Sequence, residues 1–419
     1  MSERIEKSVG IIGGGISGLF SAYYLLQEGC EVTIIERGSF TDGCSYGNAG
    51  MIVPSHIVPL AQPGMISKGM RWMLDAQSPF YVKPRLSGDL VKWGYLFWKN
   101  ATEKHVRYAI PHLRDLSLLS KELYQDLADE PGFSFGWKEK GLLMLFKNAA
   151  TRHEMEEEAR TANQSGIEAQ LLSVLEVQAL EPDVHLSVEG AVFYPGDAQI
   201  YPNQLIADLV SFLRKSGVGF VENQVVEDFV VQNHKIETIS TNGGSYTFDE
   251  VVVAAGAWSP ILTHKLGLSL PLQGGKGYSF LAGSLTNQMQ IPAIMLEART
   301  TATPMAGGVR FAGTLEIAGT DESVNMNRVR GIHNSIQQYY PDIEVAFPEK
   351  EDVWSGLRPC SPDGLPYLGR VKGFENLILA TGHGMMGVSM GPATGKLVAE
   401  IVAGRNTSVN VEAFEPRRF

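Results

Sequence analysis

Cysteine is scarce in this sequence, whose 419 residues include three, Cys30, Cys44 and Cys360. Disulfide-stabilised secreted domains need many regularly spaced cysteines, and metal sites need cysteines or histidines at close spacing. Neither pattern is present. We therefore expect no disulfide framework, no bound metal and, by default, a protein of the reducing cytoplasm.

Positive charge is also in short supply. The chain has 35 Lys and Arg against 46 Asp and Glu, which gives a net charge of −11. Nucleic-acid binding and general adhesion to anionic lipid both depend on an excess of positive charge. This balance argues against a nucleic-acid partner and leaves open only a local, peripheral contact with the inner face of the membrane.

Long hydrophobic runs without interruption are missing as well. Residues 9–26 and 376–395 carry no Lys, Arg, Asp or Glu, but glycines break both runs. A membrane-spanning helix needs about 20 predominantly apolar residues. A secretory signal peptide needs a basic start and a small-residue cleavage site, and here the first eight residues mix acids with bases. Both runs are therefore expected to belong to a globular fold.

The most informative pattern lies in residues 9–36, which predict a strand, a glycine-rich turn, a helix and a second strand that ends in Glu36. In the turn, Gly13 permits a tight bend, Gly15 lets the backbone approach a pyrophosphate, and Gly18 lets helix and strand pack closely. The helix begins at Ile16 and Ser17, where free N–H groups face an anion. Glu36 falls where an acid accepts hydrogen bonds from a ribose diol, and Arg37 follows it. These residues predict an adenine-dinucleotide site, and the alternative is an ordinary glycine-rich strand–helix turn.

Three further segments are expected to line the same site. A glycine-rich loop near residue 48 can lie flat along a ligand, and two buried strands, residues 250–254 and 376–381, each end in a glycine-containing turn. The second turn leads into a helix that starts near residue 391. The predicted cofactor-binding residues are Gly13, Gly15, Ile16, Ser17, Gly18, Glu36, Arg37, Ser45, Asn48, Ala49, Gly50, Met51, Val226, Ala255, Gly256, Trp258, Gly382, His383, Gly384, Met385, Gly387 and Val388.

Hydrophobic periodicity outlines the remaining elements. Spacings of three and four predict helices between residues 63 and 129, and residues 150–165 and 202–215 also fit helices. Asn242 and Gly243 predict a hairpin turn. Residues 276–320 alternate as antiparallel strands do.

The order of these motifs resembles the D-amino-acid oxidase/dehydrogenase superfamily of FAD enzymes, and the resemblance spans the whole chain. The resemblance rests on the motifs Gly13–Gly18, Glu36, Asn48–Gly50, Ala254–Trp258, Gly356–Pro359, Pro362–Pro366 and Thr381–Gly384. Ser45–Gly50, the helical insertion after Met65 and Lys276–Ser279 look most like the bacterial D-amino acid dehydrogenase small subunit.

The resemblance implies noncovalent FAD and an α/β fold with two domains. We expect a Rossmann-like FAD-binding domain from residues 1–55, 200–262 and 355–419. A second, antiparallel-sheet substrate domain would comprise residues 56–199 and 263–354, with a helical insertion near 63–129. The helix near residue 391 would aim its N–H groups at the flavin edge that becomes negative on reduction.

The resemblance also implies catalytic residues. Arg358 matches the arginine that binds the substrate carboxylate, and its alternative role is a structural pair with Asp363 or with a carbonyl of the C-terminal helix. Tyr278 falls on the sheet over the flavin, where its alternative is an ordinary cross-strand aromatic. Tyr201 and His56 are weaker candidates.

Two departures from the family pattern bear on the chemistry. Arg310 aligns with a lysine that favours reaction with oxygen in sarcosine-oxidase-like members, which casts doubt on efficient oxidase activity. Cys360 lies near the Pro362-Asp363 motif but out of register with a cysteine that binds flavin covalently in some members.

The sequence therefore predicts an FAD-dependent dehydrogenase of D-amino acids or cyclic imino acids, such as D-proline or D-hydroxyproline. It would transfer a hydride from Cα to flavin N5 and pass electrons to a quinone or an electron-transfer protein. We expect this acceptor to approach Met65–Tyr81, near Lys68, Arg71 and Lys83; the alternative is that this segment belongs to the core or forms a lid over the substrate pocket. The alternatives are a glycine/sarcosine-type oxidase that makes hydrogen peroxide and a non-catalytic flavin-binding subunit.

Overall fold

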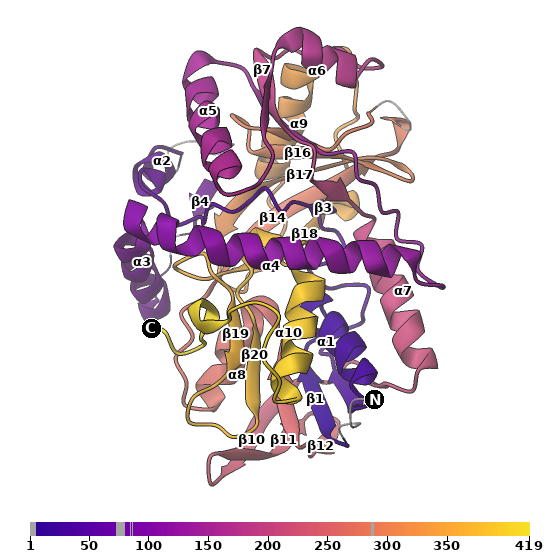
Figure 1. Cartoon of the computed structure of the whole chain (residues 1–419), viewed down its shortest axis with the longest axis vertical. Coiled ribbons are helices and arrows are strands. Elements are labelled where there is room, and N and C mark those ends of the chain that lie inside the picture. Colours follow the sequence, from indigo (N-terminus) through magenta and orange to yellow (C-terminus); the bar gives the residue numbers. More distant parts are fainter. Residues whose placement is uncertain (1–5, 73–79, 84, 86, 286–288) are drawn as a thin grey trace.

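The computed structural model describes residues 6–72, 80–83, 85, 87–285 and 289–419. Two sheets organise these residues, one in the lower and one in the upper half of Figure 1.

The first sheet has six strands and is parallel except at one edge. Its order is β19 (Tyr367–Arg370), β20 (Leu377–Thr381), β13 (Glu250–Val253), β1 (Ser8–Ile12), β2 (Glu31–Ile35) and β9 (Gly219–Val221), with β19 antiparallel to β20. In the centre Ile11 lies beside Ile34 and Val252. These apolar strands are buried on both faces, as parallel strands generally are.

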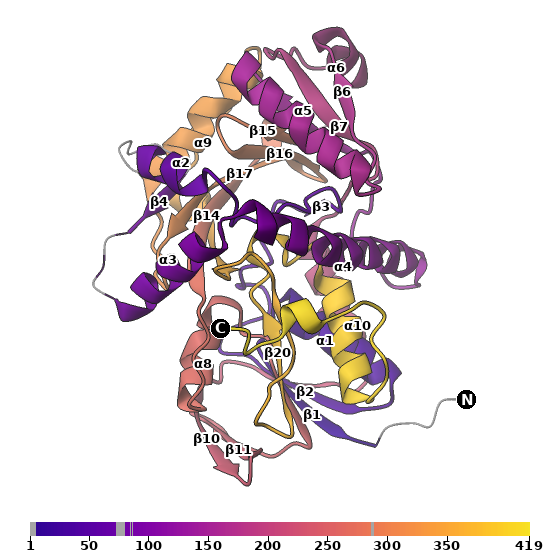
Figure 2. The ribbon, with the colours of Figure 1, turned by 60° about the vertical axis from the view of Figure 1, so that its left-hand side comes forward.

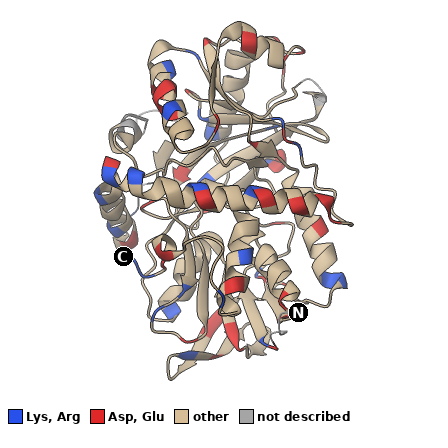
Figure 3. Ribbon diagram, in the orientation of Figure 1, with Lys and Arg blue, Asp and Glu red and all other residues tan. Residues whose placement is uncertain are grey.

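Helices cover one face of this sheet, and a small sheet with a short helix covers the other. The covering helices are α1 (Ile16–Gln27), α4 (Glu103–Asp129), α7 (Pro202–Lys215) and α10 (Gly391–Val402). The opposite face packs against β10 (Val226–Gln232), β11 (Lys235–Thr241), β12 (Gly244–Tyr246) and α8 (Ser259–Lys265). A Cβ on Gly395 of α10 would lie 2.3 Å from the backbone of Phe20, so this glycine allows α10 and α1 to approach closely. Charged residues of both signs lie along α4, whose apolar side faces α10 (Figure 3).

The second sheet has nine strands and is mostly antiparallel. Its order is β18 (Trp354–Cys360), β14 (Gln273–Ala282), β17 (Gly308–Ile317), β16 (Thr300–Met305), β15 (Ala293–Met295), β5 (Leu142–Phe146), β7 (Gly190–Tyr194) and β6 (Gln170–Leu172), while β4 (Phe80–Val82) pairs with β17. One face packs against α5 (Ala149–Gln164), and the other packs against α6 (Val174–Leu180) and α9 (Met326–Tyr339) (Figure 2).

The remaining elements are short or peripheral. They are β3 (Met51–Ile52), which pairs with β8 (Ala198–Gln199), the helices α2 (Met65–Trp72) and α3 (Gly88–Asn100), and the 3-10 turns η1 (Gly256–Trp258), η2 (Gly283–Leu285), η3 (Lys350–Asp352), η4 (Gly384–Met386) and η5 (Glu412–Phe414).

The predicted fold class is confirmed: a Rossmann-like parallel sheet accompanies a second, mostly antiparallel sheet. The hairpin turn at Asn242 and Gly243 is also confirmed, between β11 and β12. The helical prediction for residues 63–129 is wrong at Phe80–Val82, which forms β4, because edge pairing with β17 overrides the local pattern. The domain boundaries stay a prediction, although α4, inside the expected insertion, packs on the core of the first sheet.

Candidate active site

A cavity of about 1600 Å³ is lined by residues from both sheets. One wall comes from the ends of β1, β2 and β13, where side chains and turns leave the parallel sheet. The opposite wall comes from β14, β17 and β18 of the second sheet. A ligand of two chemically different parts can therefore contact both sheets at once.

The glycine turn after β1 leaves room for a phosphate. Gly13 has φ +111°, and a Cβ there would lie 2.6 Å from the carbonyl oxygen of Ala254. A Cβ on Gly18 would lie 1.9 Å from the carbonyl oxygen of Gly13, so this glycine permits close helix–strand packing. At Gly15 the nearest such neighbour is the Ser45 hydroxyl at 3.9 Å, so the space above this residue is open to the cavity. An open glycine at the start of α1 fits the pyrophosphate of a dinucleotide.

Glu36 and Arg37 lie at the end of β2 and line the same cavity. The Glu36 carboxylate accepts hydrogen bonds from the backbone N–H groups of Gly14, at 2.6 Å, and Gly38, at 2.9 Å. These bonds fix the carboxylate beside the glycine turn, where a ribose would follow the phosphates. The Arg37 guanidinium stacks over the Trp258 ring, with 3.6 Å between its carbon and the ring centroid.

Two of the hydrogen bonds that hold the loop after β2 involve Asn48. The Asn48 side chain accepts from the N–H of Gly50 at 2.8 Å, and the Arg310 guanidinium donates to the Asn48 carbonyl at 2.7 Å. Arg310 itself does not line the cavity. It therefore holds the loop, and its position gives no support to a direct substitution for an oxygen-activating lysine.

The C-terminal turn reaches the cavity through the residues between His383 and Val388. A Cβ on Gly391, where α10 begins, would lie 3.0 Å from the side chains of Ile16 and Phe20, so α10 starts in close contact with α1. That the helix start directs its N–H groups at the flavin stays a prediction. His383 is buried and hydrogen-bonds to the Thr394 hydroxyl at 2.9 Å, and burial lowers the pKa of its imidazole to about 4. This histidine is therefore a neutral wall residue.

The structure brings most of the predicted site residues together. The cavity lining includes Gly13, Gly15, Ile16, Ser17, Glu36, Arg37, Ser45, Asn48, Ala49, Met51, His56, Val226, Ala255, Gly256, Trp258, Tyr278, Arg358, His383, Gly384, Met385, Gly387 and Val388. Gly18, Gly50 and Gly382 lie behind this wall and shape its turns. Tyr201 is not brought to the cavity: it precedes α7, and its ring lies against Gly136.

Arg358 of β18 presents its guanidinium over Gly277 of β14. A Cβ on Gly277 would lie 2.2–2.4 Å from the guanidinium atoms, so the glycine provides the space that they occupy. One nitrogen donates to the Thr314 carbonyl at 2.6 Å. Asp363, the alternative partner, is bound by Arg418 at 2.7 and 3.0 Å. Burial lowers the pKa of Arg358, yet a guanidinium stays charged at neutral pH.

The backbone of β17 is distorted where it meets Arg358. The register between β14 and β17 shifts after Lys276, so Thr314 and Leu315 lie opposite Gly277. Thr314 has φ +66°, a strained conformation for a β-branched residue. The bulge turns the Thr314 carbonyl toward Arg358. The Thr314 hydroxyl lies in the cavity wall and has no hydrogen-bond partner among the described residues. Strained bulges of this kind are common beside binding sites.

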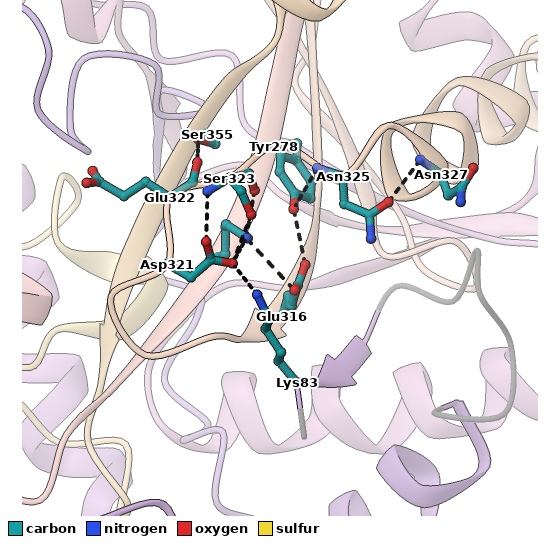
Figure 4. Close-up of polar contacts among 10 residues, drawn as sticks. Lys83, Tyr278, Glu316, Asp321, Glu322, Ser323, Asn325, Asn327 and Ser355 are labelled. Carbon is teal, nitrogen blue, oxygen red and sulfur yellow. Dashed lines mark hydrogen bonds and ion pairs between the residues drawn. The ribbon is translucent and has the colours of Figure 1, made fainter. Parts of the chain in front are cut away.

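Tyr278 lines the cavity, but its hydroxyl is committed elsewhere. Figure 4 shows the hydroxyl between Glu316, to which it donates at 3.1 Å, and the backbone N–H of Asn325, from which it accepts at 3.3 Å. The nearby Asp321 carboxylate binds the ammonium groups of Lys83 and Lys276, each at 2.9 Å. Tyr278 thus belongs to a buried polar network that joins β14, β17 and the chain after β4.

His56 lies in the cavity wall four residues after β3. Its Nδ1 is 3.1 Å from the Ser55 hydroxyl oxygen, and burial lowers the pKa of its imidazole to about 4. His56 is therefore neutral near pH 7 and able to accept a proton from a ligand.

Three cavity features were not predicted from the sequence. Gly277 makes room for Arg358, Thr314 directs a carbonyl at it, and Trp354 fills the space beside Gly47 and Gly356. The first two depend on the register between strands and have no local sequence signal. Trp354 did have a local sequence signal, because it is a large aromatic residue that precedes the Gly356–Pro359 motif.

Residues 8–401 match a family model described as FAD dependent oxidoreductase, the DAO family. The chain therefore belongs to this family, and it is an FAD-dependent oxidoreductase. The predicted family and cofactor are confirmed.

The chain is also similar to individual proteins of known name or structure. The chain is 32% identical over 418 residues to a D-amino acid dehydrogenase of Vibrio atlanticus, covering 98% of this chain and 99% of the relative. Glycine oxidase from Geobacillus kaustophilus superposes with a TM-score of 0.79 at 25% identity, covering 99% of both chains. L-proline dehydrogenase from P. horikoshii shares the fold, with a TM-score of 0.78 at 20% identity over 100% of this chain and 98% of that one.

Proposed function

We propose that this protein is an FAD-dependent dehydrogenase that oxidises D-amino acids or cyclic imino acids and passes the electrons to an acceptor other than oxygen. The observation that carries the proposal is Arg358, which presents a guanidinium to the cavity with no carboxylate partner among the described residues. The Vibrio atlanticus relative, named a D-amino acid dehydrogenase, supports the substrate class.

The residues of this chain would divide the work between the two sheets. The glycine turn at Gly13 and Gly15, with Glu36, would hold the dinucleotide part of FAD, and residues 45–51 and 383–388 would enclose its flavin. Arg358 would bind both oxygens of a substrate carboxylate, because a planar guanidinium matches that geometry. When bound, FAD supplies the acceptor for the hydride that leaves Cα.

An anaerobic screen tests the substrate class. The purified protein is mixed with L- and D-amino acids and cyclic imino acids in the absence of oxygen, and flavin absorbance is followed. We expect bleaching by D-amino or imino acids. Bleaching by none of them would favour a non-catalytic flavin protein, and a preference for glycine or sarcosine would favour the oxidase alternative.

Reoxidation of the reduced flavin tests the acceptor. We expect slow reoxidation in air and fast reoxidation by a soluble quinone or dye, without stoichiometric hydrogen peroxide. Fast reoxidation by oxygen with one peroxide per substrate would instead establish an oxidase, the activity named for the Geobacillus kaustophilus structure.

Noncovalent FAD is the expected binding mode. Cys360 is buried, its thiol donates to the Arg358 carbonyl, and it does not line the cavity. Cys44 does line the cavity, and its sulfur accepts from the N–H of Leu357 at 3.2 Å. Acid precipitation should leave the flavin in the supernatant, whereas flavin retained in the pellet would implicate Cys44.

A peripheral membrane contact is proposed on α3 rather than on Met65–Tyr81. Residues 73–79 and the side chains of Lys68 and Arg71 lie outside the described part of the chain, and Lys83 pairs with Asp321. In contrast, α3 exposes Val91, Tyr95 and Trp98 by 73, 58 and 63% on one helical face. Aromatic and aliphatic side chains grouped in this way suit the interface of a bilayer.

Vesicle flotation tests this contact. The wild type should float with vesicles that contain anionic lipid, and a Tyr95→Ser, Trp98→Ser variant should not, while its flavin reduction by substrate is unchanged. Equal flotation of both proteins would remove α3 as the contact. No helix among the described residues is both long and apolar enough to cross a membrane.

A further inference from the structure

A chain of three polar side chains runs from the cavity wall into the protein interior. His56 lines the cavity, and its Nδ1 contacts the Ser55 hydroxyl at 3.1 Å. The Ser55 hydroxyl donates to the Asp197 carboxylate at 2.5 Å, and the Ser55 N–H donates to the other carboxylate oxygen at 3.2 Å. Asp197 is 1% exposed, so the chain ends on a buried acid.

The hydrogen bonds of Ser55 determine which nitrogen of His56 carries the proton. Ser55 has one hydroxyl proton and donates it to Asp197, so its oxygen is available to His56 only as an acceptor. Nδ1 must then carry the imidazole proton, and Nε2 keeps its lone pair. Nε2 makes no hydrogen bond with the described residues, which leaves it free for a ligand in the cavity.

This order of residues differs from that of a serine hydrolase. There the histidine lies between the acid and the serine and activates the hydroxyl as a nucleophile. Here the serine lies between the acid and the histidine, and its proton points away from the cavity. The arrangement therefore suits proton transfer and not acyl transfer.

We propose that Asp197, Ser55 and His56 form a proton relay that takes a proton from the substrate ammonium group. The inference rests on the proposed function, because an amine must be uncharged before its Cα can lose a hydride. In the relay, His56 Nε2 gains the ammonium proton, Nδ1 passes its proton to the Ser55 oxygen, and Ser55 passes its own to Asp197. The substrate becomes a free amine, Asp197 becomes a carboxylic acid, and His56 and Ser55 end neutral.

The surroundings of the relay favour Asp197 as the final acceptor. Burial raises the pKa of Asp197 to about 7 and lowers that of His56 to about 4, so the proton prefers the carboxylate. The ionisable groups near the acid are Lys121 of α4, whose charge opposes the shift, Tyr194 of β7 and, beyond Tyr194, Glu158 of α5. None of them hydrogen-bonds to Asp197.

The pH dependence of flavin reduction by substrate tests the relay. In the wild type, the anaerobic reduction rate should fall at low pH with an apparent pKa near that of Asp197. In Asp197→Asn and in Ser55→Ala, only substrate that is already a free amine can react. The fall of the reduction rate at low pH, which we call the acid limb, should then move up by about two pH units. The reduction rate should be roughly 10- to 100-fold lower than in wild type at pH 8 and return to near the wild-type rate above pH 10.

Matched variants separate the relay from a structural role. Ser55→Thr keeps the hydroxyl and should restore the wild-type limb. Asp208→Asn changes another buried aspartate, which binds the Ser134 N–H at 2.7 Å away from the cavity, and should leave the limb unchanged. A loss of equal size at every pH, or an unmoved limb in both Asp197→Asn and Ser55→Ala, would overturn the relay.

Infrared difference spectra give a readout that does not depend on turnover. An α-methyl amino acid has no Cα–H to lose, and its binding should produce the carbonyl band of one protonated carboxylic acid, absent from Asp197→Asn. No such band would contradict proton transfer to Asp197. If no amino or imino acid bleaches the wild-type flavin, the proposed function fails instead.

Discussion

Replacement of Gly277 by alanine should disable the substrate anchor without removing it. The added Cβ would lie 2.2 Å from one Arg358 guanidinium nitrogen, 2.3 Å from the other and 2.4 Å from the central carbon. Nonbonded atoms of these types prefer about 3.5 Å, so the guanidinium must move by about 1 Å. Gly277 does not have positive φ, so alanine fits the backbone itself.

The cost of this change should fall on binding and not on folding. The displaced atoms are the far end of a flexible side chain, and the glycine-to-alanine change reduces the entropy of the unfolded chain. A misplacement of about 1 Å at a positioning group lowers rates by about 100-fold, which corresponds to about 2.7 kcal/mol. We therefore expect kcat/KM to fall about 100-fold at nearly unchanged thermal stability.

Anaerobic stopped-flow reduction at several substrate concentrations, with thermal unfolding, measures both effects. Gly94→Ala is the control, because no atom of the described residues beyond the neighbouring helix backbone lies within 4 Å of a Cβ there. It should keep wild-type kinetics and gain about 0.5–1 kcal/mol of stability. Wild-type kcat/KM in Gly277→Ala, with a normal flavin spectrum, would refute the assignment of Arg358 as the carboxylate anchor. Arg358→Lys, which keeps the charge but loses the planar fork, should lose roughly 30- to 1000-fold if the assignment holds.

Other changes separate the remaining roles. Gly15→Val should fold but lose FAD, because the valine side chain would occupy the open space that we assign to the pyrophosphate. Flavin absorbance after gel filtration measures the loss, and stoichiometric FAD would contradict this assignment. Tyr278→Phe should lower stability by about 1 kcal/mol and leave substrate KM unchanged, because its hydroxyl bonds to Glu316 and not to the cavity; a large rise in KM would place the hydroxyl on the substrate. The raised pKa of Asp197 stabilises the fold fully below about pH 4, and this contribution is lost as pH rises through about 7. As pH rises from 5 to 8, the wild type should therefore lose about 1–4 kcal/mol of stability that Asp197→Asn does not lose, so urea unfolding of the variant should become less favourable relative to wild type by that amount; a pH-independent difference would argue against the shift.

The glycine turn and Glu36 were predictable because the chemistry lies within one strand–turn–helix unit. Gly18 packs against Gly13 within this unit and Gly15 faces open cavity space, whereas the tight space at Gly13 is set by Ala254 of a distant strand end. Arg358 was found through the Gly356–Pro359 motif, and its guanidinium does reach the cavity. Local sequence patterns were therefore sufficient to predict the glycine turn and Glu36, and the family motif was sufficient to predict Arg358.

The substrate half depends on register and on contacts distant in sequence. Asp197 meets Ser55 only because β3 pairs with β8, and nothing in either segment alone indicates the other. The bulge at Thr314 follows from a register shift between two long strands, which alternation does not reveal. Tyr201 was expected at the site from its sequence context, but the start of α7 directs it against Gly136.

The position of β1 has a consequence for the synthesis of the protein. This first strand lies in the middle of its sheet, and its neighbour β13 is complete only at Val253, with β20 beyond it complete only at Thr381. On the ribosome, β1 and α1 therefore emerge long before the partners that bury them, and they stay exposed or depend on chaperones for most of translation. Residues 383–388 add a wall to the cavity, so FAD can bind tightly only after these residues have been made. The yield of folded protein should then depend more on the supply of FAD than on how the chain folds early in its synthesis.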